Sequence, residues 1–252
     1  MTSLLKTVCL PLLFLSLLVP PVFAQQTITL NTSNDPPNAT DDFQGIGDLV
    51  LTEAFKRMGM QLKIMRLPSE RALQNANDAN DDGTFAQVAG LSKMYPNLIQ
   101  VPEPITRFEF IAISRKYNVP IIGWKSLAPF NVGFITGWKI LEENITGSKS
   151  LTKVKDKTVL FDMLMAERLD LIVYDRRQAM AVLQDMRTAE TINFMEPSLA
   201  VHDMYPYLHK KHENLALPLA ETIRTMKADG AYRKILARIL LPLSITGDHE
   251  KN

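Results

Sequence analysis

The segment Val101–Ser114, VPEPITRFEFIAIS, indicates how the chain is divided. Pro102 and Pro104 prevent a helix, and the apolar run Phe108–Ile113 that follows is interrupted only by Glu109. Aromatic and β-branched residues bounded by prolines predict a buried strand. Strand–helix alternations precede this segment, and a second, smaller set follows it. We therefore predict that the segment carries the chain from one lobe into another.

Residues 1–24 have the pattern of a secretory signal. Lys6 is the only charged residue before Asp35, the run Val8–Val19 is mostly apolar, and Ala24 is a small residue suited to cleavage. The alternative is a membrane anchor, which needs a longer apolar run than this one. The sequence thus predicts a signal peptide and a mature protein in a bacterial periplasm.

The composition excludes several classes of protein. Of the 252 residues, 46% are hydrophobic and 22% are charged, and the formal net charge is +1. These values are typical of a globular protein, and so balanced a charge argues against a nucleic-acid partner. The single cysteine, Cys9, lies in the predicted signal. The mature protein would therefore have no thiol for a disulfide or for catalysis, which suits a periplasm better than a eukaryotic secreted domain.

Hydrophobic periodicity predicts strands that alternate with helices along the mature chain. Predicted strands cover residues 26–30, 61–67, 85–92, 98–101, 131–135, 169–174 and 191–194. Predicted helices begin at Gly47, at Ser69 (as its cap) and at Trp138, and cover 156–167, 176–186, 215–227 and 231–241. The extended segment 197–208 is predicted to return the chain to the first lobe. This alternation argues for an α/β fold with largely parallel sheets.

Several segments together carry a family likeness. They are the exported N-terminus, a strand ending near Asp35-Pro36-Pro37, GIGDLVLTEAF from Gly45, LDLIVYD over Leu169–Asp175, and KADGAY over Lys227–Tyr232. In these features the chain resembles the family-3 periplasmic solute-binding proteins, the receptors of polar amino-acid ABC transporters. The resemblance covers nearly the whole mature chain.

The resemblance implies a type II periplasmic-binding-protein fold, with two α/β lobes joined by two crossover strands and a ligand cleft between them. Residues 25–114 and 201–252 would form the first lobe, and residues 115–200 the second. In amino-acid binders of this family, an Asp five residues after a strand's first Asp contacts the α-amino group of the ligand. Asp170 and Asp175 match that spacing. The alternative role for Asp175 is a helix N-cap.

One family position is absent from this chain. Family members hold the α-carboxylate with an Arg a few residues after a Gly-(aliphatic)-Ser/Thr turn. Here Gly90-Leu91-Ser92 is followed by Lys93-Met-Tyr-Pro-Asn97, without an Arg. A lysine is a point charge and lacks the guanidinium fork that clamps a carboxylate. An ordinary α-amino acid is therefore in doubt as the ligand, unless Arg71 or Arg107 supplies the charge.

Other residues are candidates by position. The turn Thr136-Gly137 joins a strand to a helix, where backbone N–H groups suit an anion, although an ordinary turn is the alternative. Phe85 and Phe108 are predicted nearest the cleft, with core packing as the alternative. The full predicted ligand-binding set is Asp35, Arg71, Phe85, Gly90, Ser92, Arg107, Phe108, Thr136, Gly137, Trp138 and Asp175.

We expect no metal, cofactor or catalytic residue. Asp78–Gly83 begins like a calcium loop, but Ala89 stands where that loop needs a bidentate Glu. His209 and His212 are three residues apart, yet lysines lie between them, and we expect a solvated helix start.

The sequence therefore predicts a non-enzymatic periplasmic receptor that closes on a small polar solute, amino-acid-like or a small carboxylate or amine, and delivers it to an ABC permease. One alternative is a sensory or interaction module with the same fold, read by a membrane kinase. Another is a dehydratase-like enzyme, for which Glu70, Glu103 and Asp175 are the candidate acids. We expect a monomer, because a receptor must open.

Overall fold

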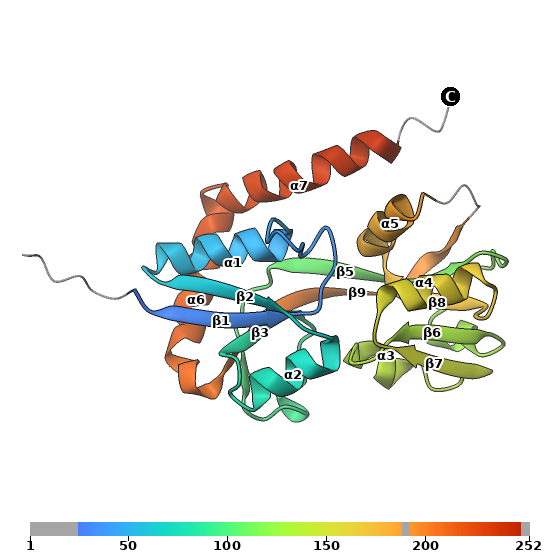
Figure 1. Cartoon of the computed structure of the whole chain (residues 1–252), viewed down its shortest axis with the longest axis horizontal. Helices are drawn as coiled ribbons and strands as arrows, with labels where there is room; N and C mark the ends of the chain where they lie inside the picture. The colour runs from blue at the N-terminus through green and yellow to red at the C-terminus, as the bar shows by residue number, and fades with distance from the viewer. Residues whose placement is uncertain (1–24, 188–191, 248–252) are drawn as a thin grey trace, which may run out of the picture.

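The computed structural model describes residues 25–187 and 192–247, so the predicted signal peptide lies outside the described residues. Figure 1 shows the order of the elements. The strands are β1 (Thr27–Thr32), β2 (Gln61–Arg66), β3 (Gly83–Gln87), β4 (Leu98–Gln100), β5 (Thr106–Ser114), β6 (Asn131–Ile135), β7 (Ser150–Val154), β8 (Leu171–Asp175) and β9 (Asn193–His209). The α-helices are α1 (Ile46–Arg57), α2 (Ser69–Asn77), α3 (Lys139–Asn144), α4 (Lys157–Met165), α5 (Arg176–Asp185), α6 (Glu213–Ala228) and α7 (Ala231–Gly247). Short 3₁₀ turns lie at Leu91–Lys93, Trp124–Leu127 and Lys210–His212.

The strands form one hydrogen-bonded path in the order β2-β1-β3-β9-β5-β8-β6-β7, with β4 also paired to β9. We call the half with β1–β4, α1, α2, α6 and α7 lobe 1, and the half with β6–β8 and α3–α5 lobe 2 (Figure 1). β1 is parallel to β2 and β3, and β6 is parallel to β7 and β8. The antiparallel strands β5 and β9 join the lobes. The predicted α/β fold with two connecting strands is confirmed, whereas the residue boundaries of the lobes stay a prediction.

Strand β9 is longer than the sequence predicts. Two separate segments are predicted around Pro197, but a single strand of 17 residues runs from Asn193 to His209. The register of the β5–β9 pair shifts between Phe110 and Ala112, opposite the stretch that contains Pro197. A proline, which has no N–H for the ladder, is tolerated at such an irregularity.

Three further local predictions are corrected by the structure. Ser69 does not cap α2: it is the first helical residue, Pro68 precedes it, and there is no side-chain cap hydrogen bond. β3 ends at Gln87 rather than at residue 92. β7 was not predicted, since it is an edge strand whose side chains are mostly exposed and which includes Lys153.

The histidines near the end of β9 are not a solvated helix start. His212 Nε2 lies 2.7 Å from Asp82 Oδ1, and His209 Nδ1 accepts a hydrogen bond from the Lys211 N–H. Asp82 also accepts the Thr29 N–H at 2.8 Å. These contacts tie the end of β9 to β1.

Each lobe has helices packed over its strands. In lobe 1, α1, α6 and α7 pack together, and α1 buries Val50, Leu51, Ala54 and Phe55 (Figure 1). In lobe 2, Leu160, Phe161 and Leu164 of α4 pack with β8. Among the helices that the structure describes, none is long and apolar enough to cross a membrane. The two lobes meet along one edge, where a cleft can lie between them.

Candidate ligand-binding cleft

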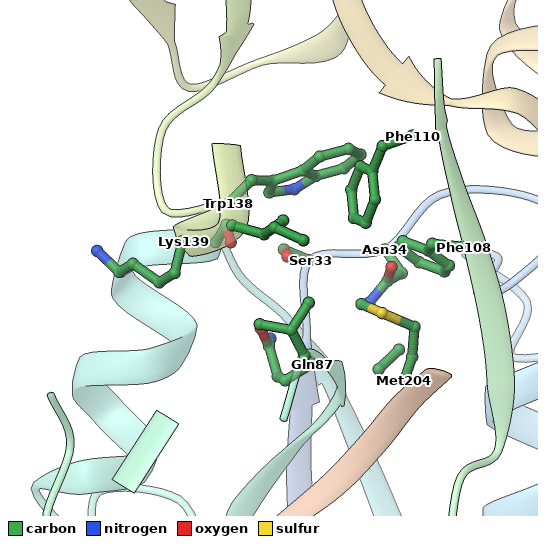
Figure 2. Close-up of a pocket in the computed structure, with 12 residues that line it drawn as sticks. Ser33, Asn34, Gln87, Phe108, Phe110, Trp138, Lys139 and Met204 are labelled. Carbon is green, nitrogen blue, oxygen red and sulfur yellow. The ribbon is translucent and has the colours of Figure 1, made fainter. Parts of the chain in front are cut away.

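An inner chamber lies between the two lobes, and Figure 2 shows its side chains. It is lined from the ends of β1 and β3 and the start of α2 in lobe 1, from the start of α3 in lobe 2, and from β5 and β9. The lining residues are Ser33, Asn34, Ser69, Ala86, Gln87, Val88, Phe108, Phe110, Trp138, Lys139, Ile140 and Met204. The carboxyl ends of strands, where α/β proteins bind ligands, therefore converge here.

Aromatic rings form one wall of the inner chamber. The ring centroids of Phe108 and Phe110 are 6.0 Å apart, and that of Trp138 lies 6.2 Å and 5.8 Å from them. Trp138 is held from behind by Tyr174, whose ring stacks on it at 4.7 Å. In Figure 2, Trp138 and Phe110 lie on one side of the space and Gln87 on the other. A flat apolar group could pack against this wall.

Uncharged polar groups complete the inner chamber. Gln87 Nε2 makes one long hydrogen bond, 3.4 Å to Thr84 Oγ1. Gln87 Oε1, the hydroxyls of Ser33 and Ser69, and the indole N–H of Trp138 have no hydrogen-bond partner among the described residues. These groups are available to a ligand as donors and acceptors.

Among the described residues that line the inner chamber, Lys139 alone has an ionisable side chain. Its Nζ lies 2.6 Å from Glu70 Oε2 and 3.0 Å from Glu142 Oε2. Burial lowers the pKa of Lys139, but the hydrogen bonds to Glu70 and Glu142 outweigh burial and raise the pKa above its ordinary value. Lys139 therefore stays charged and is already neutralised by protein carboxylates.

A charged outer chamber adjoins the inner one and shares Ser33, Ser69 and Trp138 with it. Its other lining residues are Thr32, Asp35, Arg66, Leu67, Pro68, Ile135, Lys155, Asp156, Lys157 and Tyr174. Both lobes again contribute. The cleft therefore has an interior whose one described ionisable side chain, Lys139, is ion-paired, and a mouth lined by several charged side chains.

Asp35 bridges the lobes at this mouth. From lobe 1, its Oδ1 lies 2.7 Å from Lys157 Nζ, and its Oδ2 accepts a hydrogen bond of 2.6 Å from the Tyr174 hydroxyl. Its backbone N–H donates to Gln178 Oε1 at 3.3 Å. Burial, followed by the charge of Asp35, raises the pKa of Tyr174 well above its usual range. Tyr174 therefore remains a donor to the carboxylate at physiological pH.

A second bridge joins α2 of lobe 1 to α3 of lobe 2. The Glu70–Lys139 ion pair crosses the interface beside Gly137, which has φ of +89°. A Cβ on Gly137 would lie 2.5 Å from the backbone nitrogen of Glu70. Only glycine fits this close approach of two backbones.

Several predicted site residues come together at this interface. Phe108 and Trp138 line the inner chamber, Asp35 and Trp138 line the outer one, and Gly137 lies at the second bridge. Thr136 immediately precedes the bridge and is half-buried. The backbone N–H groups of Thr136 and Gly137 already donate to Val154 O and Glu142 Oε1.

Asp175 caps α5, as the alternative reading of the sequence expects. Its side chain is fully buried and accepts the backbone N–H groups of Gln178 at 3.2 Å and Glu109 at 2.9 Å. Burial raises the pKa of Asp175 to about 6, and the two N–H groups oppose that rise. Asp175 lines neither the inner nor the outer chamber.

The remaining predicted residues also lie outside both chambers. Phe85 is buried in the lobe 1 core, Arg71 is exposed, and Arg107 pairs with Asp203 at 3.0 Å. Gly90 and Ser92 form a turn in which Ser92 Oγ donates to Leu98 O. A ligand contact by any of these residues stays a prediction. Of the acids considered for catalysis, Glu103 pairs with Arg224 and Lys227 on α6, away from the partners of Glu70 and Asp175.

The sequence alone missed much of the inner chamber. The residues not predicted are Ser33, Asn34, Ser69, Ala86, Gln87, Val88, Phe110, Lys139, Ile140 and Met204. Ser33 and Asn34 directly follow β1, and Gln87 is the last residue of β3. Their positions at strand ends are the signal that could have found them. Met204 lies inside β9 and carries no such signal.

One curated sequence and several solved structures resemble this chain. No protein-family model matches the chain. An uncharacterised protein of Shewanella oneidensis is 25% identical over 219 residues, which cover 82% of this chain and 80% of that protein.

Solved structures resemble the chain more closely in fold than in sequence. An ancestral arginine-binding protein bound to arginine has a TM-score of 0.70 at 16% identity, covering 85% of this chain and 98% of its own. The GluR0 ligand-binding core from Nostoc punctiforme in complex with L-glutamate has a TM-score of 0.71 at 14% identity, with coverages of 84% and 98%. A histidine kinase sensor domain with similarity to periplasmic binding proteins has a TM-score of 0.74 at 19% identity, with coverages of 86% and 96%. With two lobes, two connecting strands and a cleft between them, the chain has the two-lobe periplasmic-binding-protein fold.

Proposed function

We propose that this protein is a non-enzymatic receptor that captures a small solute between its lobes and closes around it. The observation that carries the proposal is the inner chamber, whose lining comes from lobe 1, lobe 2 and both connecting strands. A solute in this chamber contacts both lobes only when they are together. These differential contacts favour the closed form.

Closure is proposed to be a hinge motion about the two connecting strands, near 114–117 and 199–203. The lobe boundaries predicted from the sequence, 25–114 with 201–252 and 115–200, belong to this proposal. Ser114 supports the first hinge, because its hydroxyl donates to Asp170 O and accepts the N–H groups of Lys116 and Tyr117. Closure would then require only a few residues of the two connecting strands to change their backbone dihedral angles.

We further propose that the protein acts in the periplasm and passes its solute to an ABC permease. The signal-like residues 1–24 support this location, and one structural neighbour is the substrate-binding protein of an amino acid ABC transporter. The alternative is that a membrane kinase reads the closed form, as the kinase sensor domain among the neighbours suggests. Deleting the gene distinguishes the two: loss of solute uptake supports transport, and loss of a transcriptional response with normal uptake supports sensing.

The test of the receptor proposal is ligand-dependent closure. A thermal-shift screen of amino acids, small carboxylates, amines and uncharged ring compounds identifies ligands, since one at a hundredfold its Kd adds about 2.7 kcal/mol of stability. X-ray scattering with the best ligand is expected to show a smaller radius of gyration than without it. A tightly bound solute that leaves the scattering unchanged would contradict the proposal.

A further inference from the structure

We infer that the solute carries a carboxylate and that this group binds in the outer chamber, among Arg66 and the start of α2 in lobe 1 and Lys155 of lobe 2. This inference rests on the proposed receptor function and specifies the class of its solute. It follows from the room, the charge and the unpaired donors of the outer chamber.

The outer chamber has room for a small solute. Its volume is about 240 Å³, whereas the inner chamber has about 20 Å³, which is space for about one water-sized group. In this arrangement of the lobes, the body of a solute therefore lies in the outer chamber, and only a small group enters the inner one. Because both lobes line the outer chamber, a solute bound there still contacts both of them.

The charge of the lining favours an anion. Three cations, Arg66, Lys155 and Lys157, line the outer chamber, against two acids, Asp35 and Asp156, which leaves one positive charge in excess. A group with a single negative charge, such as a carboxylate, neutralises this excess. A phosphate group, with a charge of about −1.5 to −2 at pH 7, exceeds it.

The guanidinium of Arg66 is only partly paired. Its Nη2 lies 3.5 Å from Asp35 Oδ1, and its Nε lies 3.4 Å from Asp41 Oδ1, in a side chain that is 97% exposed. Its Nη1 is buried and has no hydrogen-bond partner among the described residues. Asp35 has shorter bonds elsewhere, to Lys157 and Tyr174. A solute carboxylate would give Arg66 a partner that matches its planar fork.

Lys155 brings a second cation from lobe 2. It directly follows β7, is exposed, and forms no ion pair within the described part of the chain. The acid beside it, Asp156, caps α4 by accepting the N–H groups of Thr158 at 2.7 Å and Val159 at 3.2 Å. Lys155 therefore remains available to an anion, and it reaches that anion from the lobe opposite Arg66.

The start of α2 adds uncharged donors. Pro68 precedes the helix without a side-chain cap, and the backbone N–H groups of Ser69, Glu70 and Arg71 have no hydrogen-bond partner among the described residues. Ser69 lines both chambers and is only 3% exposed, and its hydroxyl is also without a partner there. A carboxylate at this helix start would accept from these donors and complement the helix dipole.

Arg66 differs in position from the arginine of the family pattern. It is the last residue of β2, not part of the Gly90–Ser92 turn, and it is the one arginine among the described residues that line either chamber. Arg71 and Arg107, which the sequence suggested as replacements, line neither chamber. The carboxylate is therefore expected to be held from a different element.

A cationic solute is the rival, because two acids line the same chamber. Asp35 is already bonded to Lys157 and Tyr174, and Asp156 caps α4. An ammonium group would therefore lie beside three cations without a free carboxylate to pair with, which is unfavourable. The geometry favours the carboxylate.

Matched straight-chain probes test the charge of the solute. One set is succinate, succinamide and putrescine, and the other is glutarate, glutaramide and cadaverine, so that only the end groups differ within a set. Ethylenediphosphonate replaces both carboxylates of succinate by phosphonates. Calorimetry is expected to show that the dicarboxylates bind at least about tenfold more tightly than the amides and amines, and more tightly than the diphosphonate.

Two lysines at opposite ends of β7 provide a matched pair of variants. Lys155→Gln removes the free cation of the outer chamber and is expected to weaken binding of the better dicarboxylate about twofold to fivefold, with a smaller dependence on salt. Lys149→Gln makes the same change at an exposed lysine that lines neither chamber, and we expect it to leave binding unchanged.

A pair of arginine variants tests the contact from lobe 1. Arg66→Gln is expected to weaken dicarboxylate binding at least about tenfold. Arg57→Gln is the control, since Arg57 pairs with Glu53 and Asp229 and lines neither chamber. If Arg66→Gln lowers the melting temperature, the exposed Lys155 pair gives the deciding reading.

The outcomes separate this inference from the receptor proposal. Dicarboxylates that bind best, lose affinity in Lys155→Gln and Arg66→Gln, and reduce the radius of gyration support both. The carboxylate site is overturned, and the receptor kept, if closure occurs with an amide, amine, diphosphonate or screened compound without a carboxylate that binds as tightly as the dicarboxylates. Dicarboxylate affinity that is unchanged in both variants also overturns the site. If no probe and no screened compound binds with closure, both are overturned.

Discussion

Gly137 shows how one residue decides whether the lobes can meet. Two separate features require glycine at this position. One is its positive φ, and the other is the distance of only 2.5 Å that a Cβ would have from Glu70 N. The first concerns backbone strain within lobe 2. The close approach to Glu70 arises only when lobe 1 lies against lobe 2, so it affects the closed form and not lobe 2 alone.

A Gly137→Ala substitution is therefore expected to oppose the closed form. The methyl group would overlap the backbone of α2, and we expect the affinity for solute to fall at least about tenfold. Calorimetry and scattering with ligand measure this. Gly59→Ala is the control, because Gly59 also has a positive φ, +73°, but nothing lies within 4 Å of its Cβ position. An equal loss of affinity in both variants would contradict the interlobe explanation.

Asp175 makes stability depend on pH through its burial. The pKa is raised to about 6 in the folded protein from an ordinary value of 3.8. The folded state thus binds this proton more tightly than the unfolded state, and the resulting stability is full below pH 3.8 and lost as the pH rises through about 6.

We expect the free energy of unfolding of the wild type, relative to Asp175→Asn, to fall by about 2 kcal/mol between pH 4 and pH 7. Asparagine does not ionise and keeps one oxygen acceptor, which replaces one of the two carboxylate oxygens that accept the Glu109 and Gln178 N–H groups; the loss of the other acceptor is independent of pH. Urea unfolding of both proteins at several pH values measures the difference. Parallel pH profiles for the two proteins would show that Asp175 does not have this shifted pKa.

Between elements, the ion pair from α2 to α3 is the clearest contact across the cleft. Glu70 Oε1 also accepts the Tyr95 hydroxyl at 3.0 Å, and Lys139 Nζ lies 5.8 Å from the Tyr95 ring centroid. Tyr95 thereby orients the carboxylate towards lobe 2. The pair is partly exposed, so solvent screening limits its strength.

Glu70→Gln is expected to reduce solute affinity by about threefold to tenfold, because roughly 1 kcal/mol of closed-state stabilisation is lost. The difference in affinity between the wild type and this variant should shrink as the salt concentration rises, because salt screens the ion pair. Glu53→Gln is the control, since Glu53 pairs with Arg57 within α1 and makes no contact with lobe 2. Equal effects of the two substitutions would mean that Glu70 does not act through closure.

At the scale of the whole molecule, two bridges from different elements stabilise one arrangement of the lobes. Asp35 follows β1, whereas Glu70 lies in α2. If each bridge biases the same two-state hinge, their effects on the open–closed equilibrium should add.

The radius of gyration without ligand is therefore expected to increase from wild type to Asp35→Asn or Glu70→Gln, and further in the double variant. Saturating ligand should return all four proteins to one closed value, because the chamber contacts remain. X-ray scattering measures both series. A double variant as compact as the wild type without ligand would show that these bridges do not control the lobes.

The fold class could be predicted without coordinates, because the strands and helices of this chain follow from local patterns of apolar residues. In LIVYD, Leu171–Asp175, every residue is buried, and such a continuous apolar run predicts an internal strand without knowledge of its neighbours. The prolines before Phe108 likewise mark the start of β5. The likeness of the C-terminal helices to a known family then indicated how the elements are arranged.

Most residues of the inner chamber could not be predicted in this way, because contacts between distant segments bring them together. Ser33, Gln87, Trp138 and Met204 are far apart in the sequence and meet because β9 and β5 bring the two lobes together. The continuous course of β9 past Pro197 depends on its pairing with β5, and Lys139 has a carboxylate partner in Glu70 only because the other lobe lies against it. Contacts of this kind are set by pairing between distant segments, which no local pattern encodes.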